Sequence, residues 1–447
     1  MASAEFVDAP EALSDARVGS YHILILLLCG AALFVDGFDT LAIGYVAPVL
    51  GKSLALARGA LGPVFAIGGL GALIGTLASG PLTDRVGAKP VIIGSLFLFG
   101  LLSIATAYAN SVPALTWLRF ASGLGLGAVA PNGLALAAEY MPRRLRVTLV
   151  ILVWFGFSLG SGFAGGITAL LLTHYTWRSV FVFGGIIPLL LIPILVFALP
   201  NSLSHLLKIP SARPKIASLL ARLNPAARPP ADAIFVTSER KQVGFPVALL
   251  FTEGRAPITI LLWLMFFANL MALFFMNSWL PTVLNNAGMS AYAAIIIGSV
   301  SHFGGIAGGL AIAPLCDKFN GYITLGVAFL LSGLSILAIG ASGDAATAAT
   351  AAVFCAGFFT FGAQNAANAM VSTVYPGAMR GTGTSWALGV GRTGQIVGPA
   401  IGGVLLSQHW PSNNIMYVVA IPGLVAAACA LSISAMGGSA KRKAALT

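Results

Sequence analysis

The sequence predicts an all-α polytopic membrane protein with twelve transmembrane helices in two pseudo-symmetric six-helix bundles. Hydrophobic residues make up 58% of the 447 positions and charged residues only 8%, and the apolar residues are gathered into long continuous runs. A run of about 20 apolar residues is long enough to cross a bilayer as a helix. A transmembrane β-barrel is excluded because its strands are short segments of alternating hydrophobicity separated by turns.

Twelve such runs follow one another along the chain. They lie near residues 22–46, 59–79, 90–109, 113–138, 147–172, 178–199, 256–283, 290–314, 322–341, 347–372, 382–407 and 412–436. A polar, proline-rich stretch from Pro200 to Pro257 divides these runs six and six. We therefore expect an N-terminal bundle over 1–200, a cytoplasmic linker over 201–255 and a C-terminal bundle over 256–447.

The basic residues predict the orientation of the chain. Cytoplasmic loops of membrane proteins carry an excess of Lys and Arg. Of the 24 basic residues, 19 fall at the termini or in loops on one side of the predicted membrane, and three fall on the other side. Both termini are therefore expected in the cytoplasm, and the net charge of +11 requires no nucleic-acid partner. The four cysteines are scattered without metal-ligand spacing, so no metal, cofactor or disulfide is expected.

Two motifs recur at nearly the same distance. The segment Gly-Pro-Leu-Thr-Asp at 80–84 returns as Ala-Pro-Leu-Cys-Asp at 313–317, and Pro142 with Arg146 returns as Pro376 with Arg380. These echoes suggest a duplication. Two related six-helix halves with a site near the middle of the membrane are an architecture of secondary transporters.

Two carboxylates, Asp36 and Asp39, lie three residues apart in the first apolar run. An ionised Asp at the centre of a spanning helix costs roughly 2.5 to 3.5 kcal/mol, so such residues usually face a protein cavity and handle ions. Arg119 in the fourth run has about the same predicted depth as Asp39, so the two can pair. Helix motion that makes and breaks this pair would let Asp39 hold and release a proton. A static pair that fixes helix packing is the alternative.

Arg392 is the basic residue deep in the second half, and its planar fork suits a carboxylate. It is the first candidate for a substrate carboxylate and Arg119 is the second; the alternative is an arginine satisfied by backbone carbonyls. His302 lies in mid-helix and suits a proton relay, or is a core histidine. Trp154 is a candidate for contact with an aromatic ring. Further candidates for contact with a ligand are amide side chains, which can equally bond between helices: Asn132, Gln364, Asn365 and Asn368.

The loop after the second run resembles a motif of the major facilitator superfamily, Gly-x-x-x-Asp-Arg-x-Gly-Arg-Lys. Five positions match, and Ala88 stands where the family often has a basic residue. The resemblance implies a gate on the cytoplasmic side. Asp84 is expected to accept hydrogen bonds from the N-terminus of a neighbouring helix, where the dipole favours an anion, and Arg85 is expected to bridge to an acid such as Glu139. The full set of gating residues expected on this basis is Gly80, Asp84, Arg85, Gly87, Glu139, Arg144 and Asp317.

The sequence Asp-Gly-Phe-Asp at 36–39 narrows the resemblance to the aromatic acid:proton symporters, which carry benzoate-like and hydroxybenzoate-like acids. Arg119-Phe120, Pro131-Asn132 and His302-Phe303 also agree, whereas Asn201-Ser202 replaces the usual Glu-Ser after the sixth run. The resemblance implies inward, proton-coupled transport of a small aromatic carboxylate by alternating access. Asp36, Asp39 and His302 would couple proton movement to transport. The protein is expected to work as a monomer in a bacterial-type inner membrane.

Two other functions remain open at this point. Proton-driven efflux of drugs or organic anions is the main alternative; its drug form predicts a large apolar cavity in which acids recognise cations, whereas Arg119 and Arg392 favour anions. A transporter-like receptor would bind the acid and signal without moving it, but no signalling domain accompanies the spans. No catalytic constellation is present in the sequence, so an enzyme is not expected.

Overall fold

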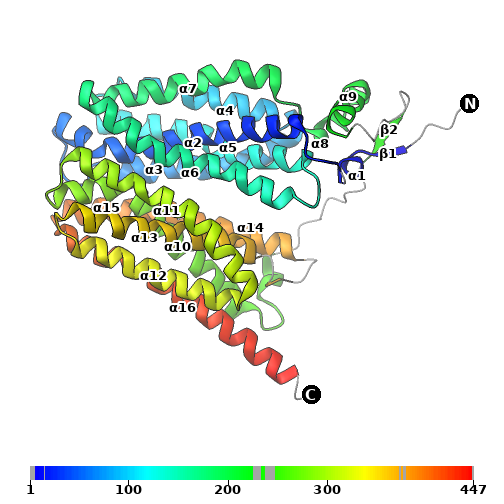
Figure 1. The fold of residues 1–447 in the computed structure, drawn as a ribbon. Coiled ribbons are helices and arrows are strands. Elements are labelled where there is room, and N and C mark those ends of the chain that lie inside the picture. Colours follow the sequence, from blue (N-terminus) through cyan, green and yellow to red (C-terminus); the bar gives the residue numbers. More distant parts are fainter. Residues whose placement is uncertain are drawn as a thin grey trace, which may run out of the picture.

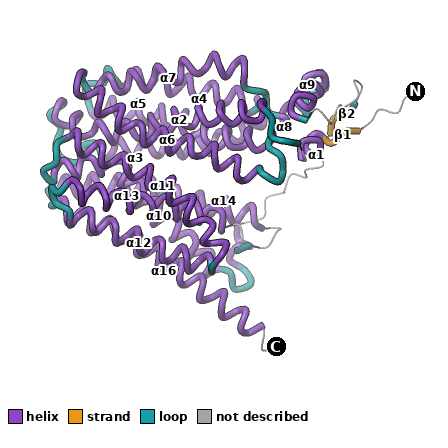
Figure 2. The backbone as a smooth tube through the Cα atoms, viewed as in Figure 1, coloured by secondary structure: helices purple, strands orange, loops and turns teal. Residues whose placement is uncertain are grey.

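The computed structural model describes residues 6–14, 16–224, 233–236, 247–371, 374–375 and 379–444. In this part of the chain, long helices run side by side along one direction (Figure 1). Eleven of them are long and apolar enough to cross a membrane. The predicted all-α class of membrane protein is confirmed. Figure 2 shows one addition that the sequence did not predict, a small pair of strands at one end.

The first six long helices pack together as one group, which we call the first half. Proline in the first turn starts α3 and α5, where its missing N–H is no loss, and the Ser111 side chain caps α5 by accepting from the Ala114 amide. The helices of this half are α2 (Ser20–Ser53), α3 (Gly62–Val86), α4 (Ala88–Thr106), α5 (Val112–Tyr140), α6 (Arg146–His174) and α7 (Trp177–Ala198).

The remaining long helices form the second half. Side-chain caps start two of them, since Ser290 accepts from the Ala293 amide and Asn320 accepts from the Ile323 amide. A short 3-10 helix, η2 (Val247–Phe251), precedes this half. Its helices are α10 (Ala256–Asn286), α11 (Ala291–Lys318), α12 (Gly321–Ala341), α13 (Ala346–Met370), α14 (Arg380–Arg392), α15 (Gly394–Ser407) and α16 (Ser412–Ala444).

The span expected over 382–407 is not one continuous helix. It is divided into α14 and α15 at Thr393. The hydrogen bonds tighten there to a three-residue spacing, from Thr393 N to Val390 O and from Ile396 N to Thr393 O, which is the pattern of a 3-10 turn. Gly391 and Gly394 flank the turn, and glycine lowers helix stability. Counting these two pieces as one broken span brings the eleven continuous helices to the expected twelve.

The polar segment between the halves is partly folded and is not a solvated loop throughout. It contains α8 (Leu203–Leu206), the 3-10 helix η1 (Pro210–Ala212) and α9 (Arg213–Leu223). Leu220 and Leu223 of α9 are buried in the core of the first half. Near the N-terminus, β1 (Phe6–Asp8) leads into α1 (Ala9–Ser14), and β1 pairs in parallel with β2 (Ile234–Val236). The start of the chain and this segment therefore meet on the first half.

The two halves meet at one end and diverge at the other (Figure 1). We call the end that carries α1, α8 and α9 the terminal end, and the opposite end the far end. One apolar core at the far end contains residues of both halves, including Tyr45 and Trp279. Toward the terminal end, each half has a separate core. The halves are therefore closed against each other at the far end.

Glycine makes the close contact at the far end possible. A Cβ at Gly44 of α2 would lie 2.3 Å from the carbonyl oxygen of Asn277 in α10, and a Cβ at Gly62 of α3 would lie 3.0 Å from Gly403 Cα in α15. Small residues let helix backbones approach in this way.

The two halves also touch between α6 and α11, where the rings of Phe163 and Phe303 meet edge to face with centroids 5.8 Å apart.

Candidate functional site

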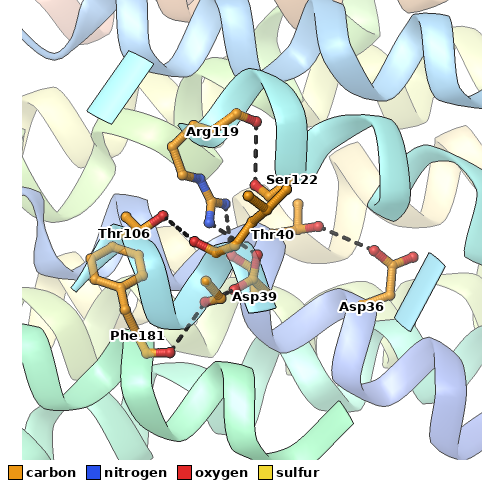
Figure 3. Close-up of polar contacts among 9 residues, drawn as sticks. Asp36, Asp39, Thr40, Thr106, Arg119, Ser122 and Phe181 are labelled. Atoms are coloured by element: carbon orange, nitrogen blue, oxygen red, sulfur yellow. Dashed lines mark hydrogen bonds and ion pairs between the residues drawn. The ribbon is translucent and has the colours of Figure 1, made fainter. Parts of the chain in front are cut away.

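Asp39 and Arg119 form an ion pair inside the first half, as the sequence predicted from their depths. Arg119 Nη1 lies 3.0 Å from Asp39 Oδ2, and Nη2 donates to the backbone carbonyl of Asp39 at 3.1 Å. Figure 3 shows the two side chains pointing toward one another between their helices. The pair is buried, so its charges are stabilised by each other and by neighbouring polar groups and not by water.

The second oxygen of Asp39 has a partner that sequence reasoning missed. Ser103 of α4 donates to Asp39 Oδ1 at 2.7 Å and lies 3.2 Å from the carbonyl oxygen of Phe181 in α7. The ring of Phe181 also faces the Arg119 guanidinium at 5.9 Å. The available signal for this contact was a serine in an apolar run, which also contains Ser95 and Thr106. The pair thus ties together α2, α4, α5 and α7.

Asp36 has different surroundings from Asp39 although it lies on the same helix. Successive helical residues rotate by about 100°, so a spacing of three turns the side chain by roughly 60°. Asp36 accepts from the Thr40 hydroxyl at 3.4 Å and lies apart from the pair of Asp39 and Arg119 (Figure 3). Its carboxylate interacts electrostatically with the guanidinium of Arg392 from the second half. Asp36 therefore faces the boundary between the halves.

Arg392 crosses that boundary. It is the last residue of α14, and its Nη1 donates to Thr76 Oγ1 of α3 at 2.7 Å. No other hydrogen bond of Arg392 is formed with the described part of the chain, so the remaining N–H donors of the guanidinium are open to a ligand. Three residues further on, Gln395 donates to the carbonyl oxygen of Gly69 at 2.9 Å. Two hydrogen bonds thus hold the broken span against α3.

Amide side chains of the second half form a chain of hydrogen bonds. Asn269 of α10 donates to Gln364 Oε1 at 2.8 Å, and Gln364 Nε2 donates to Asn368 Oδ1 at 2.8 Å. Gln364 and Asn368, which the sequence proposed as ligand contacts, are therefore engaged with each other. Asn365 differs, because it makes no hydrogen bond with the residues that the structure describes. Its amide nitrogen approaches Gly309 of α11.

His302 and Trp154 lie against aromatic rings. The His302 ring packs on Phe361 with centroids 4.9 Å apart, and it has no hydrogen-bond partner among the described residues. Its side chain is buried. Trp154 of α6 stacks on Phe157 with centroids 5.4 Å apart. The two residues are on different halves, and within the described part of the chain Asp39 bonds to Ser103 and Arg119 and to neither of them.

Asn132 is occupied inside the first half. Its amide nitrogen donates to the carbonyl oxygen of Ala128 at 2.7 Å, and its amide oxygen accepts from the Thr83 hydroxyl. Both ends of the amide therefore bond within α5 or to α3, and only 4% of the residue is exposed. This arrangement fits the alternative that the sequence left open for such amides, a bond between helices.

The proposed gating residues lie at the terminal end, but their partners differ from those expected. Glu139 accepts from the Ser202 hydroxyl, the Leu203 amide and the Ser204 hydroxyl at 2.7 to 2.9 Å, which anchors α8. Arg85 forms no hydrogen bond or ion pair within the described ranges, so the expected bridge to Glu139 is absent here. Sequence reasoning missed α8 because a helix of four residues at the start of the polar segment is too short to show an apolar period.

The other gating residues are exposed or form turns. Lys208 donates to the carbonyl oxygen of Asp84 at 2.9 Å and has its Nζ 3.9 Å from Asp84 Oδ1. Gly87, with φ of 88°, separates α3 from α4, and a Cβ there would lie 3.1 Å from the ring of His205. Gly80, Arg144 and Asp317 are all exposed.

Comparisons with known proteins agree with this architecture. The family model of the Major Facilitator Superfamily matches residues 29–391 and 303–445. The 4-hydroxybenzoate transporter PcaK of Pseudomonas aeruginosa is 36% identical over 428 residues, which are 96% of this chain and 96% of that protein. The gallate transporter of Pseudomonas putida is 37% identical over 432 residues, covering 96% of this chain and 95% of the relative.

A solved structure shares the fold. The crystal structure of a D-xylose-proton symporter matches with a TM-score of 0.71 at 18% identity, over 92% of this chain and 97% of the other. An identity this low bears on the fold alone, whereas the two relatives above cover nearly the whole chain at more than one third identity. The chain therefore belongs to the Major Facilitator Superfamily, in the same family as these aromatic acid transporters, and it is a multi-pass membrane transport protein and not an enzyme.

Proposed function

We propose that this protein imports a small aromatic carboxylate of the benzoate or hydroxybenzoate type together with protons. Two bundles, over 1–200 and 256–447, alternate access to a site between them, and the segment 201–255 links them. The names of the relatives support the substrate class, since they transport 4-hydroxybenzoate and gallate. Both compounds are aromatic acids, and the shared chemistry is a carboxylate on a ring.

The observation that carries the proposal is the position of Arg392. Its guanidinium lies at the boundary between the halves, interacts electrostatically with Asp36, and uses one hydrogen bond on Thr76. A substrate carboxylate would take two of the remaining N–H donors, because a guanidinium fork matches the two carboxylate oxygens. Asn365, whose amide is free of hydrogen bonds within the described ranges, is suited to a hydroxyl on the substrate ring.

Proton coupling follows from the two aspartates. With Asp36 ionised, the Arg392 guanidinium already interacts electrostatically with a carboxylate. A proton on Asp36 removes that charge and leaves the guanidinium to the substrate, so proton and substrate favour one another. Asp39 would release its proton when helix motion brings it against Arg119, the arrangement described above. His302 is proposed as a further proton carrier, on the boundary helix α11.

The number of protons decides the driving force. One proton with a monoanion moves no net charge and responds to the pH gradient alone. A second proton adds roughly 2.3 kcal/mol per 100 mV of membrane potential. Asp36 and Asp39 together make the second stoichiometry possible, because each can carry a proton.

The direction rests on the orientation. We propose that the terminal end faces the cytoplasm, since the loops and termini at this end contain most of the basic residues that lie outside the spans. The closed far end then faces outward across a bacterial inner membrane, and the site between the halves faces the cytoplasm. The residues proposed as a gate, Asp84 and Glu139 among them, lie at this cytoplasmic end and would help close it in the opposite state. A monomer contains both halves and suffices for this cycle.

Uptake of radiolabelled benzoate and 4-hydroxybenzoate into cells that express the protein tests the proposal. We expect accumulation above the external concentration that collapses when a protonophore is added. Cells with an empty vector are the control. Faster loss of preloaded acid, with no uptake, would replace import by efflux. Uptake that persists with the protonophore would remove proton coupling from the proposal.

A further inference from the structure

The contact between Arg392 and Thr76 depends on a proline in a third helix. Pro131 of α5 has no N–H, so the carbonyl oxygen of Gly127, four residues earlier, lacks its helical donor. Thr76 Oγ1 lies 2.7 Å from that oxygen and supplies the missing hydrogen bond. Thr76 of α3 therefore donates to a carbonyl oxygen of α5 that has no donor within α5, because Pro131 lacks an N–H.

This arrangement fixes the role of the Thr76 hydroxyl. A hydroxyl has a single proton to donate and two lone pairs to accept with. The proton is directed to carbonyl oxygens of the first half, those of Gly127 and of Ala72 at 2.9 Å. Only the lone pairs remain for Arg392, whose Nη1 lies 2.7 Å away. Thr76 is therefore held as an acceptor that faces the second half.

The backbone approach of α3 and α5 keeps this acceptor in place. A Cβ at Gly127 would lie 2.0 Å from the carbonyl oxygen of Ala72, so the two helices touch within one turn of Thr76. On the other side, Gln395 bonds to Gly69 of the same helix. The guanidinium is consequently placed by a rigid part of the first half and not by its own helix, which breaks at the next residue.

We propose that Thr76 is a positioning residue for substrate binding: as an acceptor made available by Pro131 and Gly127, it aims the Arg392 guanidinium at the substrate carboxylate. The inference rests on the function proposed above. The hydrogen bond also joins the two halves, so it must break when α3 and α14 separate.

Thr76→Val tests the positioning role, since valine keeps the branched shape and removes the oxygen. We expect the KM for 4-hydroxybenzoate uptake to rise about tenfold, which is about 1.4 kcal/mol, with a smaller change in the maximal rate. Thr76→Ser keeps the oxygen and should stay near the wild-type KM. Thr116→Val is the matched control, because the Thr116 hydroxyl bonds within its own helix, to Val112 at 2.8 Å.

A double variant shows whether the raised KM comes from the lost bond to Arg392 or from the lost bond to the Gly127 carbonyl. In Pro131→Ala the backbone regains an N–H for the Gly127 carbonyl, so Thr76→Val with Pro131→Ala leaves Arg392 as the group without its partner. We expect the raised KM to persist in the double variant when it is compared with Pro131→Ala alone. Recovery of the KM of Pro131→Ala would overturn the proposal, as would equal losses in Thr76→Val and Thr76→Ser.

A measurement without substrate keeps this inference separate from the proposed function. Ala66 lies buried on α3 beside α15 at the far end, and a cysteine placed there reports far-end opening. In a Cys355→Ser background, which removes the exposed native thiol, Thr76→Val should speed labelling by an impermeant maleimide about tenfold. Wild-type failure to take up the tested acids would count against the function alone. Labelling and KM both unchanged in Thr76→Val would overturn the inference.

Discussion

Asp39 and Arg119 are joined by an ion pair at 3.0 Å in which the Asp39 side chain is fully buried and the Arg119 side chain is 6% exposed. Burying two charges is costly, and the pair is maintained because Ser103 and the Asp39 carbonyl satisfy further lone pairs and protons. Removal of one partner leaves an uncompensated charge in the first half. We propose that Asp39 exchanges its charge during the transport cycle; a static pair that fixes helix packing is the alternative.

Asp39→Asn separates proton coupling from binding. The amide keeps the shape of the side chain and the bond from Ser103, but it cannot take up and release a proton as a carboxylate does. We expect accumulation against a gradient to be lost, while exchange of labelled for unlabelled acid across the membrane continues. Uptake and exchange in the same vesicles measure both. Asp344→Asn, in the loop before α13, is the control and should change neither. Concentrative uptake by Asp39→Asn would remove Asp39 from the coupling mechanism.

Arg392→Lys tests the role of the guanidinium fork. Lysine keeps the positive charge but cannot bind both oxygens of a carboxylate in one plane. We expect the KM for the aromatic acid to rise at least about tenfold, equivalent to about 1.4 kcal/mol. Arg213→Lys, on the exposed side of α9, provides the control for the same substitution at the surface. Equal KM values in the two variants would show that charge alone suffices at 392.

Glu139→Gln tests the anchor of α8. The carboxylate accepts three hydrogen bonds from residues 202–204. A hydrogen bond to a charged group contributes about 1.5 to 3 kcal/mol to stability. We expect the thermal unfolding temperature of the purified protein in detergent to fall by several degrees. Arg85→Ala should leave it unchanged, because Arg85 is exposed. A matching fall in both variants would restore the bridge that the sequence motif suggested.

Gly87→Ala distinguishes the two glycines of the loop motif. Gly87 has φ of 88° and ψ of 159°, a conformation that costs a residue with a side chain about 1 to 3 kcal/mol, and its Cβ would also press on His205. We expect a clear loss of thermal stability. Gly80→Ala should be neutral or slightly stabilising, since Gly80 is helical with open space around its Cβ position. Equal stability of the two variants would contradict the assigned backbone constraint.

The sequence predicted those parts of the site that depend on depth in the membrane. Apolar runs mark where each span begins, and the rise of a helix converts position into depth, so Asp39 and Arg119 could be matched without a structure. The contact of Arg392 with Thr76 joins residues 316 positions apart. Hydropathy reports that a helix leaves water, but it does not report which helices touch, because lipid and protein interiors are similarly apolar.

The remaining differences have local causes that patterns of hydropathy do not register. The break at Thr393 falls in a run that is rich in glycine on both sides, so no single glycine marks the turn. The pairing of β1 with β2 joins two three-residue strands more than 200 residues apart. Strands this short carry too few residues for an alternating pattern to be recognised.

Gly44→Ala tests whether the far end sets the balance between the two states. Its Cβ would lie 2.3 Å from the Asn277 carbonyl oxygen across the boundary between the halves, so the added methyl group must push α2 away from α10. We expect faster maleimide labelling of a cysteine at position 66 and slower net uptake, because the closed far end is destabilised relative to the open one. Gly30→Ala is the control on the same helix, since no heavy atom of another element lies within 4 Å of its Cβ position. Labelling at the wild-type rate in Gly44→Ala would mean that the contact of α2 with α10 yields without opening the far end.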